Sequence, residues 1–332
     1  MHEKINKILI LTDGGRGVGL GHLTRCLSLV QSLKKNGMDP LFIISGDESI
    51  SSIVQDEKHV ILNWHDKKAE TYDYIRDSYI VIVDSYLEDM GFYQKISDIV
   101  KTPVYIDDTN RMDYPRGTVV NGSVNADKLA YNRRNDVRYF LGTRYVPLRE
   151  DFWEVADKVI AGRITKVLVT LGGIDSRNMV PKVLKALKSQ KPHIKKDVII
   201  SDCFRNTKKI EDLKDDSINF IYSPNSALIK QLMLEADVAI SASGQTLYEL
   251  ARVGVPTVAI TVAENQMTNI KGWREVGFVE DAGWWEDKTL LKNILRSLDV
   301  LSSCDERLKR KEIGRKFVDG KGAHRIIKEL LN

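Results

Sequence analysis

The sequence predicts an α/β protein with two domains, each a parallel β-sheet covered by helices. The chain has 332 residues, more than a single hydrophobic core usually spans. Short apolar runs alternate with helical patterns, which is typical of right-handed β-α-β units. A lysine, an apolar strand, paired glycines and a helix follow one another twice, starting at "KILILTDGG" (7–15) and "KVLVTLGG" (166–173). This repetition indicates two sheets of similar design.

The composition excludes several classes of protein. Charged residues make up 29% of the chain with a net charge of +4, and no block of basic residues is present, which argues against nucleic-acid binding. The three cysteines are far apart, which argues against disulfides and zinc and fits a reducing cytoplasm. The apolar run near the N-terminus is too short for a signal peptide or a membrane span. We therefore expect a cytoplasmic protein without nucleic-acid or membrane partners.

The first domain is expected over residues 1–155. Its strand candidates are short apolar runs at 7–12, 40–44, 79–84, 103–107 and 118–120. A helix pattern follows the first strand and ends near Gly37. Four carboxylates come at the ends of strands, where ligands bind in parallel sheets: Asp13, Asp84, Asp107 and Asp108.

The second domain is expected over residues 156–332, and the connection between the domains within 149–165, which has no strand pattern. Its strand candidates begin with the run at 166 and continue at 197–200, 218–222, 237–241 and 256–260. The final helix pattern, 322–331, fits either domain, and we expect that it packs back on the first.

The glycine-rich stretch "DGGRGVGLGH" (13–22) leads directly into the first helix. It contains neither the G-x-G-x-x-G dinucleotide fingerprint nor the Gly-Lys-Ser/Thr of a Walker loop. Flexible glycines and a helix N-terminus favour an anion, and Arg25 shares a helix face with His22 and adds a positive charge. His22 is either a polar residue at a helix start or, as its neighbours favour, a catalytic base.

A second loop, at 241–246, joins a strand to a helix and also exposes backbone N–H groups suited to a phosphate. Glu249, one turn into that helix, is placed to accept hydrogen bonds from sugar hydroxyls. The alternative is that Thr246 and Glu249 form only a capping box.

The sequence contains a third polar stretch, but none of the common metal-site or hydrolase motifs. Glu264, Asn265 and Gln266 follow another strand, where they either bind a base or ribose or form an exposed turn. HExxH, paired Cys/His sets and GxSxG do not occur. Asp107 and Asp108 are adjacent on an extended segment and point to opposite faces, so we expect no metal site.

Several motifs resemble those of one enzyme family. "TDGGRGVGLGHLTRCLSL" (12–29) is similar to the N-terminal motif of the UDP-2,4-diacetamido-2,4,6-trideoxy-β-L-altropyranose hydrolases of pseudaminic acid biosynthesis and of related spore-coat polysaccharide proteins. Further matching motifs follow in the same order: "VIVDSY" (81–86), "YIDD" (105–108), "LGTRYVPLREDF" (141–152), "LVTLGGIDSRN" (168–178), "SASGQTLYELARVGVPTVAI" (241–260) and "AENQ" (263–266).

The resemblance implies a GT-B fold, in which two Rossmann-like domains face each other across a cleft. It implies that His22 activates water, that Glu249 lies near the ribose and that Tyr86 faces the sugar. The diphosphate would be held by Ser243, Gly244, Gln245 and Thr246, and the rest of the UDP-sugar by Asn265 and Gln266. The remaining candidate substrate-binding residues are Asp13, Gly19, Gly21, Arg25, Gly172, Gly173 and Glu264.

The expected reaction is therefore hydrolysis of a UDP-sugar with inversion, without a metal or a cofactor. The chain departs from the family pattern, for example with "SASGQT" (241–246) in place of the usual "GAGGST". Two alternatives stay open. One is a GT-B glycosyltransferase, in which His22 deprotonates an acceptor hydroxyl. The other is a catalytically silent protein that binds nucleotide sugars.

Overall fold

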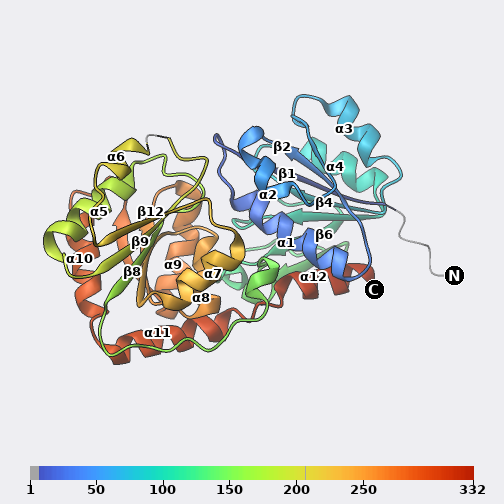
Figure 1. The fold of residues 1–332 in the computed structure, drawn as a ribbon. Helices are drawn as coiled ribbons and strands as arrows, with labels where there is room; N and C mark the ends of the chain where they lie inside the picture. The colour runs from blue at the N-terminus through green and yellow to red at the C-terminus, as the bar shows by residue number, and fades with distance from the viewer. Residues whose placement is uncertain (1–6, 206) are drawn as a thin grey trace. The chain divides into compact units, whose positions relative to one another are not determined.

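The computed structural model describes residues 7–205 and 207–332, which form two compact units (Figure 1). The first unit contains the described residues up to Glu150 together with Lys321–Asn332, and the second contains Asp151–Gly320. The chain thus changes unit at residue 151, a few residues before the expected domain boundary, and returns to the first unit for its last helix.

The first unit contains a seven-stranded sheet in which all the strands are parallel, in the order β3-β2-β1-β4-β5-β6-β7. The strands are β1 (Ile8–Asp13), β2 (Leu41–Ser45), β3 (His59–Ile61), β4 (Ile80–Asp84), β5 (Thr102–Ile106), β6 (Gly117–Asn121) and β7 (Val137–Leu141). The helices are α1 (Gly21–Lys35), α2 (Ser51–Val54), α3 (Lys68–Ile75), α4 (Met90–Ile99) and α12 (Gly322–Leu331), with short 3₁₀ turns at Glu48–Ile50, Ala126–Lys128 and Thr143–Tyr145.

Both faces of this sheet are buried because successive side chains of each strand point to opposite sides. In β1, Ile8 and Ile10 pack with α1, α2 and α12, whereas Leu9 and Leu11 pack with α3 and α4. The buried side chains of α12 belong to the first of these clusters, which fixes the C-terminal helix to the first unit.

The second unit contains a six-stranded parallel sheet in the order β10-β9-β8-β11-β12-β13. The strands are β8 (Lys166–Thr170), β9 (Lys195–Ile200), β10 (Ile218–Tyr222), β11 (Val238–Ala242), β12 (Thr257–Thr261) and β13 (Val279–Trp284). The helices are α5 (Met179–Gln190), α6 (Lys208–Glu211), α7 (Ser226–Glu235), α8 (Thr246–Val253), α9 (Met267–Val276), α10 (Leu290–Val300) and α11 (Cys304–Phe317), with 3₁₀ turns at Glu150–Phe152, which spans the division between the units, and Glu264–Gln266.

The prediction of two parallel α/β domains is confirmed, and so is every strand that the sequence predicts. Strands β3, β7 and β13 were not predicted from the sequence, and all three are edge strands. An edge strand is partly exposed, so its sequence need not be a continuous apolar run; β7 contains Arg138, and β13 contains Glu280 and Asp281. Among the described residues, no helix is long and apolar enough to cross a bilayer.

Candidate functional site

The candidate site of the first unit lies at the carboxyl ends of β1 and β4, the two central strands. From β1 the chain moves outward to β2, and it later returns to begin β4 on the other side of β1. Connections on either side of this point diverge, which leaves room for a ligand above the strand ends. Asp13 ends β1 and Asp84 ends β4, and α1 begins shortly after β1.

The glycine-rich stretch forms a small hairpin between β1 and α1. Gly15 and Gly19 each donate a backbone hydrogen bond to the other's carbonyl oxygen, at 3.0 and 2.8 Å. Their φ values of 122° and 96° are strained for residues with a side chain. The N–H of Gly19 is therefore used within the hairpin. Helix α1 begins at Gly21 without a side-chain cap, so its positive N-terminus is open to an anion.

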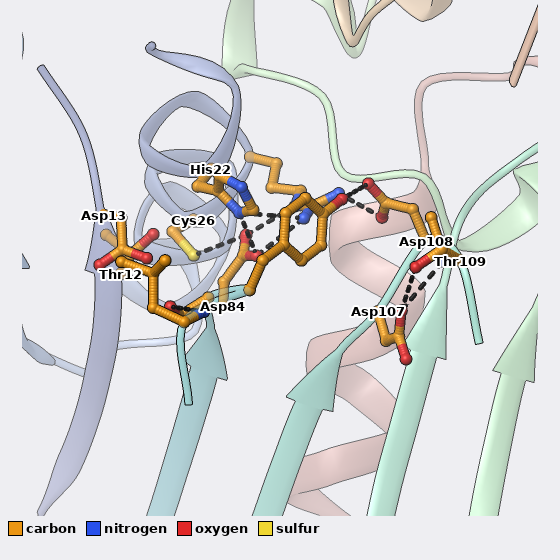
Figure 2. A network of polar contacts seen from close by, with 12 residues as sticks. Thr12, Asp13, His22, Cys26, Asp84, Asp107, Asp108 and Thr109 are labelled. Carbon is orange, nitrogen blue, oxygen red and sulfur yellow. Dashed lines mark hydrogen bonds and ion pairs between the residues drawn. The ribbon is translucent and has the colours of Figure 1, made fainter. Parts of the chain in front are cut away.

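His22 and Asp84 form a buried pair. The Nδ1 of His22 lies 2.6 Å from Oδ1 of Asp84, a residue that is fully buried, while 11% of the His22 side chain is exposed. Burial alone would raise the pKa of the Asp84 carboxyl, but Arg25 and His22 hold it well below its usual range. Because an ionised carboxylate only accepts hydrogen bonds, Nδ1 carries a proton, and a ring with no second proton then has its lone pair on Nε2. Figure 2 shows the ring against this carboxylate.

Arg25 connects this pair to Asp108. It donates to both Asp84 oxygens, from Nε at 2.6 Å and Nη2 at 2.7 Å, and from Nη1 to Asp108. Burial lowers the pKa of Arg25, but Asp108 and Asp84 more than offset this and raise it above its usual value. From the sequence, Arg25 is expected to attract an anion. In the structure both carboxylates compensate its charge.

Tyr86 completes the network. Its hydroxyl donates to Asp108 Oδ2 at 2.8 Å, and its ring meets the His22 ring edge-on with centroids 4.6 Å apart. Burial, together with the charge of Asp108, raises the pKa of the Tyr86 hydroxyl, which therefore stays a neutral donor. The Tyr86 ring thus packs against the His22 ring, and its hydroxyl is used in the hydrogen bond to the Asp108 carboxylate.

Two further residues of the site were not assigned these roles from the sequence. Cys26 lies 3.5 Å from Asp84 Oδ2 and acts as a weak donor; burial raises the pKa of its thiol, which keeps it protonated. Asp107 does not share the partners of its neighbour Asp108, because its oxygens accept from the N–H groups of Thr109 and Arg111. No cluster of metal-ligand type is present among the described residues.

The second unit has the equivalent strand ends at β8 and β11. The loop after β8 contains Gly172, with a φ of 85°, and Gly173. Helix α5 begins seven residues after Gly172 at Met179, and the Asp175 carboxylate accepts from the N–H groups of Met179 and Val180 at 2.7 and 2.8 Å. This carboxylate occupies the N-terminus of α5.

Helix α8 begins at Thr246, and its N-cap residue, Gln245, makes no side-chain capping bond. The capping-box alternative requires Thr246 itself to be the N-cap, which differs from the observed start of the helix. The first turn is closed by backbone bonds from Leu247 and Tyr248 to the carbonyls of Gly244 and Gln245. Glu249 is buried in this helix. Among the described helices, α8 thus presents an N-terminus beside a loop of small residues.

Polar side chains from α9 and β12 hold this loop. Asn269 donates to the carbonyl of Ser243 at 2.8 Å and accepts from the Tyr248 hydroxyl at 2.5 Å. The hydroxyl groups of Ser243 and Thr261 lie 3.3 Å apart. Asn269 was not singled out from the sequence, although it lies only three residues after Gln266, the end of the polar stretch that was.

The third stretch forms the 3₁₀ turn after β12. Gln266 is half-buried, and its side-chain oxygen accepts from the N–H of Val262 at 3.1 Å. Its amide nitrogen approaches the position that a side chain at Gly244 would take. Glu264 and Asn265 are exposed. The structure therefore brings Gln266 to the 241–246 loop and leaves the other two in contact with solvent.

No family model matches the chain. The bifunctional pseudaminic acid cytidylyltransferase and UDP-2,4-diacetamido-2,4,6-trideoxy-β-L-altropyranose hydrolase of Helicobacter pylori is 26% identical over 88% of this chain and 50% of its own length. The spore coat polysaccharide biosynthesis protein SpsG of Bacillus subtilis is 25% identical over 96% of this chain and 95% of its own length. The chain is a homologue of both. It spans about half the length of the curated relatives at the head of the comparison.

Solved structures identify the fold. MurG of Acinetobacter baumannii matches 98% of this chain and 99% of its own, with a TM-score of 0.66 and 13% identity. The UDP-GlcNAc 2-epimerase of Neisseria meningitidis, bound to UDP-GlcNAc, matches 98% and 100% with a TM-score of 0.65 and 13% identity. The chain has the GT-B fold. The expectation from the sequence motifs is confirmed for the fold and for the homologues.

Proposed function

We propose that the chain is a hydrolase of a nucleotide sugar, one that cleaves a UDP-linked 2,4-diacetamido-2,4,6-trideoxyhexose into UDP and the free sugar. The observation that carries this proposal is the His22–Asp84 pair at the N-terminus of α1. The homologous hydrolase of Helicobacter pylori supports the substrate and the reaction. The product would serve the synthesis of a nonulosonic acid of the pseudaminic type.

His22 acts as the general base. With Nδ1–H held by Asp84, Nε2 is left to accept a proton from water, and the Asp84 carboxylate stabilises the imidazolium that forms. The water oxygen attacks the anomeric carbon as the bond from that carbon to the diphosphate oxygen breaks. The electron pair of that bond leaves with UDP. Because water attacks the face opposite UDP in a single displacement, the configuration of the anomeric carbon is inverted.

The second unit holds the leaving group. The uncapped N-terminus of α8 and the loop of Ser243, Gly244, Gln245 and Thr246 bind the diphosphate, whose developing charge the helix dipole favours. Glu249 accepts hydrogen bonds from the ribose. The side-chain nitrogen of Gln266 approaches the place that a side chain at Gly244 would take, and Asn265, the preceding residue, is exposed. Because UDP is a good leaving group, the mechanism assigns no step to a general acid, a metal ion or a cofactor.

Release of UDP from UDP-2,4-diacetamido sugars, with and without an acceptor, tests the reaction. We expect release without an acceptor, and proton NMR of the first product should show the inverted anomer. His22→Gln should reduce the rate about 10²–10⁴-fold, the usual contribution of a general base. His59→Gln is the matched control, since His59 lies in β3 and contacts the carbonyl of Glu57.

Other outcomes assign the chain to another class. UDP release only in the presence of an acceptor would identify a glycosyltransferase, in which the same base deprotonates a hydroxyl. Tight UDP binding without turnover of any UDP-sugar would leave a nucleotide-sugar-binding protein. Full activity of His22→Gln contradicts the mechanism in either case.

A further inference from the structure

A second histidine lies at the same edge of the first sheet, outside the network just described. His65 comes from the segment between β3 and α3, and its ring lies between two carboxylates. Its Nε2 is 2.6 Å from Oδ1 of Asp13, at the end of β1, and its Nδ1 is 2.6 Å from Oε1 of Glu88, in the loop after β4. The two strand ends are thus joined through one imidazole ring.

The geometry fixes the charge of this ring. A neutral imidazole has a single N–H group, whereas each carboxylate accepts a proton donor, so both bonds form together only with the imidazolium. Burial lowers the pKa of His65, but the bonds to Asp13 and Glu88 outweigh it and raise the pKa to about 9. The same contacts, with Lys68, lower the pKa of Glu88 despite its burial. The His65 ring is therefore a cation, and the Glu88 side chain an anion, at neutral pH.

Charged and aromatic side chains surround the cluster of His65, Asp13 and Glu88. Lys68, on α3, donates to Glu88 and lies 4.2 Å from the ring centroid of Phe92, on α4. Tyr72, also on α3, has its pKa raised by burial and by Glu88 and Asp89. The His65 ring packs on Trp64 at a centroid distance of 3.8 Å, and the Trp64 indole donates to the carbonyl of Thr12.

Glu88 belongs to a short loop, Ser85–Glu88, that also carries Tyr86. Arg111 donates to the backbone carbonyls of Ser85, Tyr86 and Glu88. The loop is thus held by a guanidinium on its backbone and by an imidazolium on the Glu88 side chain. Tyr86, two residues from Glu88, contacts the His22 ring and Asp108.

We propose that His65 is a positioning residue: its imidazolium ties Asp13 to the Ser85–Glu88 loop and so holds Tyr86 against the catalytic histidine. Above the pKa of His65 the ring has a single N–H group and one of the two bonds is lost. The stabilisation is present in full below the ordinary histidine pKa and disappears as the pH rises through about 9. The loop then loosens, and binding of the sugar weakens before the chemical step does.

The test compares His65→Gln, Glu88→Gln and the control His59→Gln. Amide hydrogen exchange of residues 85–88 is followed by mass spectrometry, and the His65 ring is titrated by NMR. We expect exchange in His65→Gln to be about tenfold faster than in the control, the loss of one hydrogen bond to a charged group. In Glu88→Gln, the pKa of His65 should fall by about one unit or more. Equal exchange in His65→Gln and the control overturns the proposal.

The kinetic part of the inference rests on the proposed function. With a UDP-sugar that is turned over, His65→Gln should raise KM about tenfold, change kcat less than about threefold and abolish the alkaline limb of kcat/KM near pH 9. A normal KM and an unchanged alkaline limb overturn it. If exchange and titration behave as expected but the wild type turns over no UDP-sugar, the loop contact stands and the proposed reaction fails.

Discussion

The two units begin with the same order of elements, but the N-terminus of the first helix is capped differently in each. In both, the central strand leads into paired glycines and then a helix: β1 to α1 in the first unit, β8 to α5 in the second. Helix α1 begins without a side-chain cap, whereas the Asp175 carboxylate occupies the start of α5. In the second unit α8, after β11, also begins without a side-chain cap. A glycine-rich turn therefore does not by itself define an anion site.

The ends of β4 and β11 show a second difference. Both strands lie next to the first strand of their unit, at equivalent places in the strand order. Strand β4 ends at buried Asp84, which with Arg25 and Asp108 forms a charged network around a base. After β11 the chain carries Ser243 and Gly244, which bring no charge. The first arrangement suits proton transfer, and the second suits an anionic diphosphate, which a carboxylate would repel.

Asp84→Asn should have the largest effect. It removes the charge that orients His22 and leaves the buried guanidinium of Arg25 with a neutral partner. We expect the rate of UDP release to fall by about 10³–10⁴-fold, the effect of losing the carboxylate partner of a catalytic histidine. The free energy of unfolding should fall by about 3–5 kcal/mol, the usual result of breaking a buried ion pair. Stopped assays of UDP release and urea denaturation measure the two effects.

The effect of Asp84→Asn on the free energy of unfolding should depend on pH. The pKa of Asp84 is well below its ordinary value in the folded chain, so its contribution to stability is present above about pH 4 and is lost as the pH falls further. The difference in stability between wild type and Asp84→Asn should therefore be constant above pH 5 and shrink in acid. A difference that does not change down to pH 2 would contradict the charged state assigned to Asp84.

Gly244→Asp should have the next largest effect, because it introduces a carboxylate into the loop after β11, like the one at the end of β4 in the first unit. A side chain at this position meets only the amide nitrogen of Gln266, at 3.4 Å, so a short one is tolerated. We expect UDP affinity measured by calorimetry to fall about 10–100-fold through repulsion of the diphosphate. Gly244→Ala is the matched control, and its effect should stay below about threefold. An equal loss of UDP affinity in both variants would show that crowding, and not charge, causes the loss.

The sequence predicts the parallel sheets well because buried strands of a parallel sheet are continuous apolar runs. It also singles out Asp13 and His22, which stand before and after the glycine-rich turn that follows β1, and the 241–246 loop at the end of β11. The partners of His22 could not be assigned from the sequence alone, because Asp84 lies 62 residues away and several carboxylates end strands. His65 and Arg111 carry no motif at all; their importance arises from the loop that the fold brings between them.

Asp175→Ala tests the difference between the capped N-terminus of α5 and the N-terminus of α8. It removes two capping bonds from α5, so the free energy of unfolding should fall by about 1–2 kcal/mol. UDP affinity should not change, because the proposal assigns the diphosphate to α8 and not to α5. Calorimetry with UDP and urea denaturation measure the two quantities. A gain of UDP affinity in this variant would show that the freed N-terminus of α5 also accepts the phosphates.

Cys26→Ala should have the smallest effect on activity. The thiol is a weak donor 3.5 Å from Asp84, which already accepts three shorter bonds from His22 and Arg25. We expect the rate of UDP release to change less than about threefold, while the lost packing lowers the free energy of unfolding by about 1 kcal/mol. A thiol that supplied a reacting proton or held the ion pair in place would make the rate fall with the stability. A large fall in rate would therefore extend the site from the His22–Asp84 pair to Cys26, and a small one confines the chemistry to the charged groups.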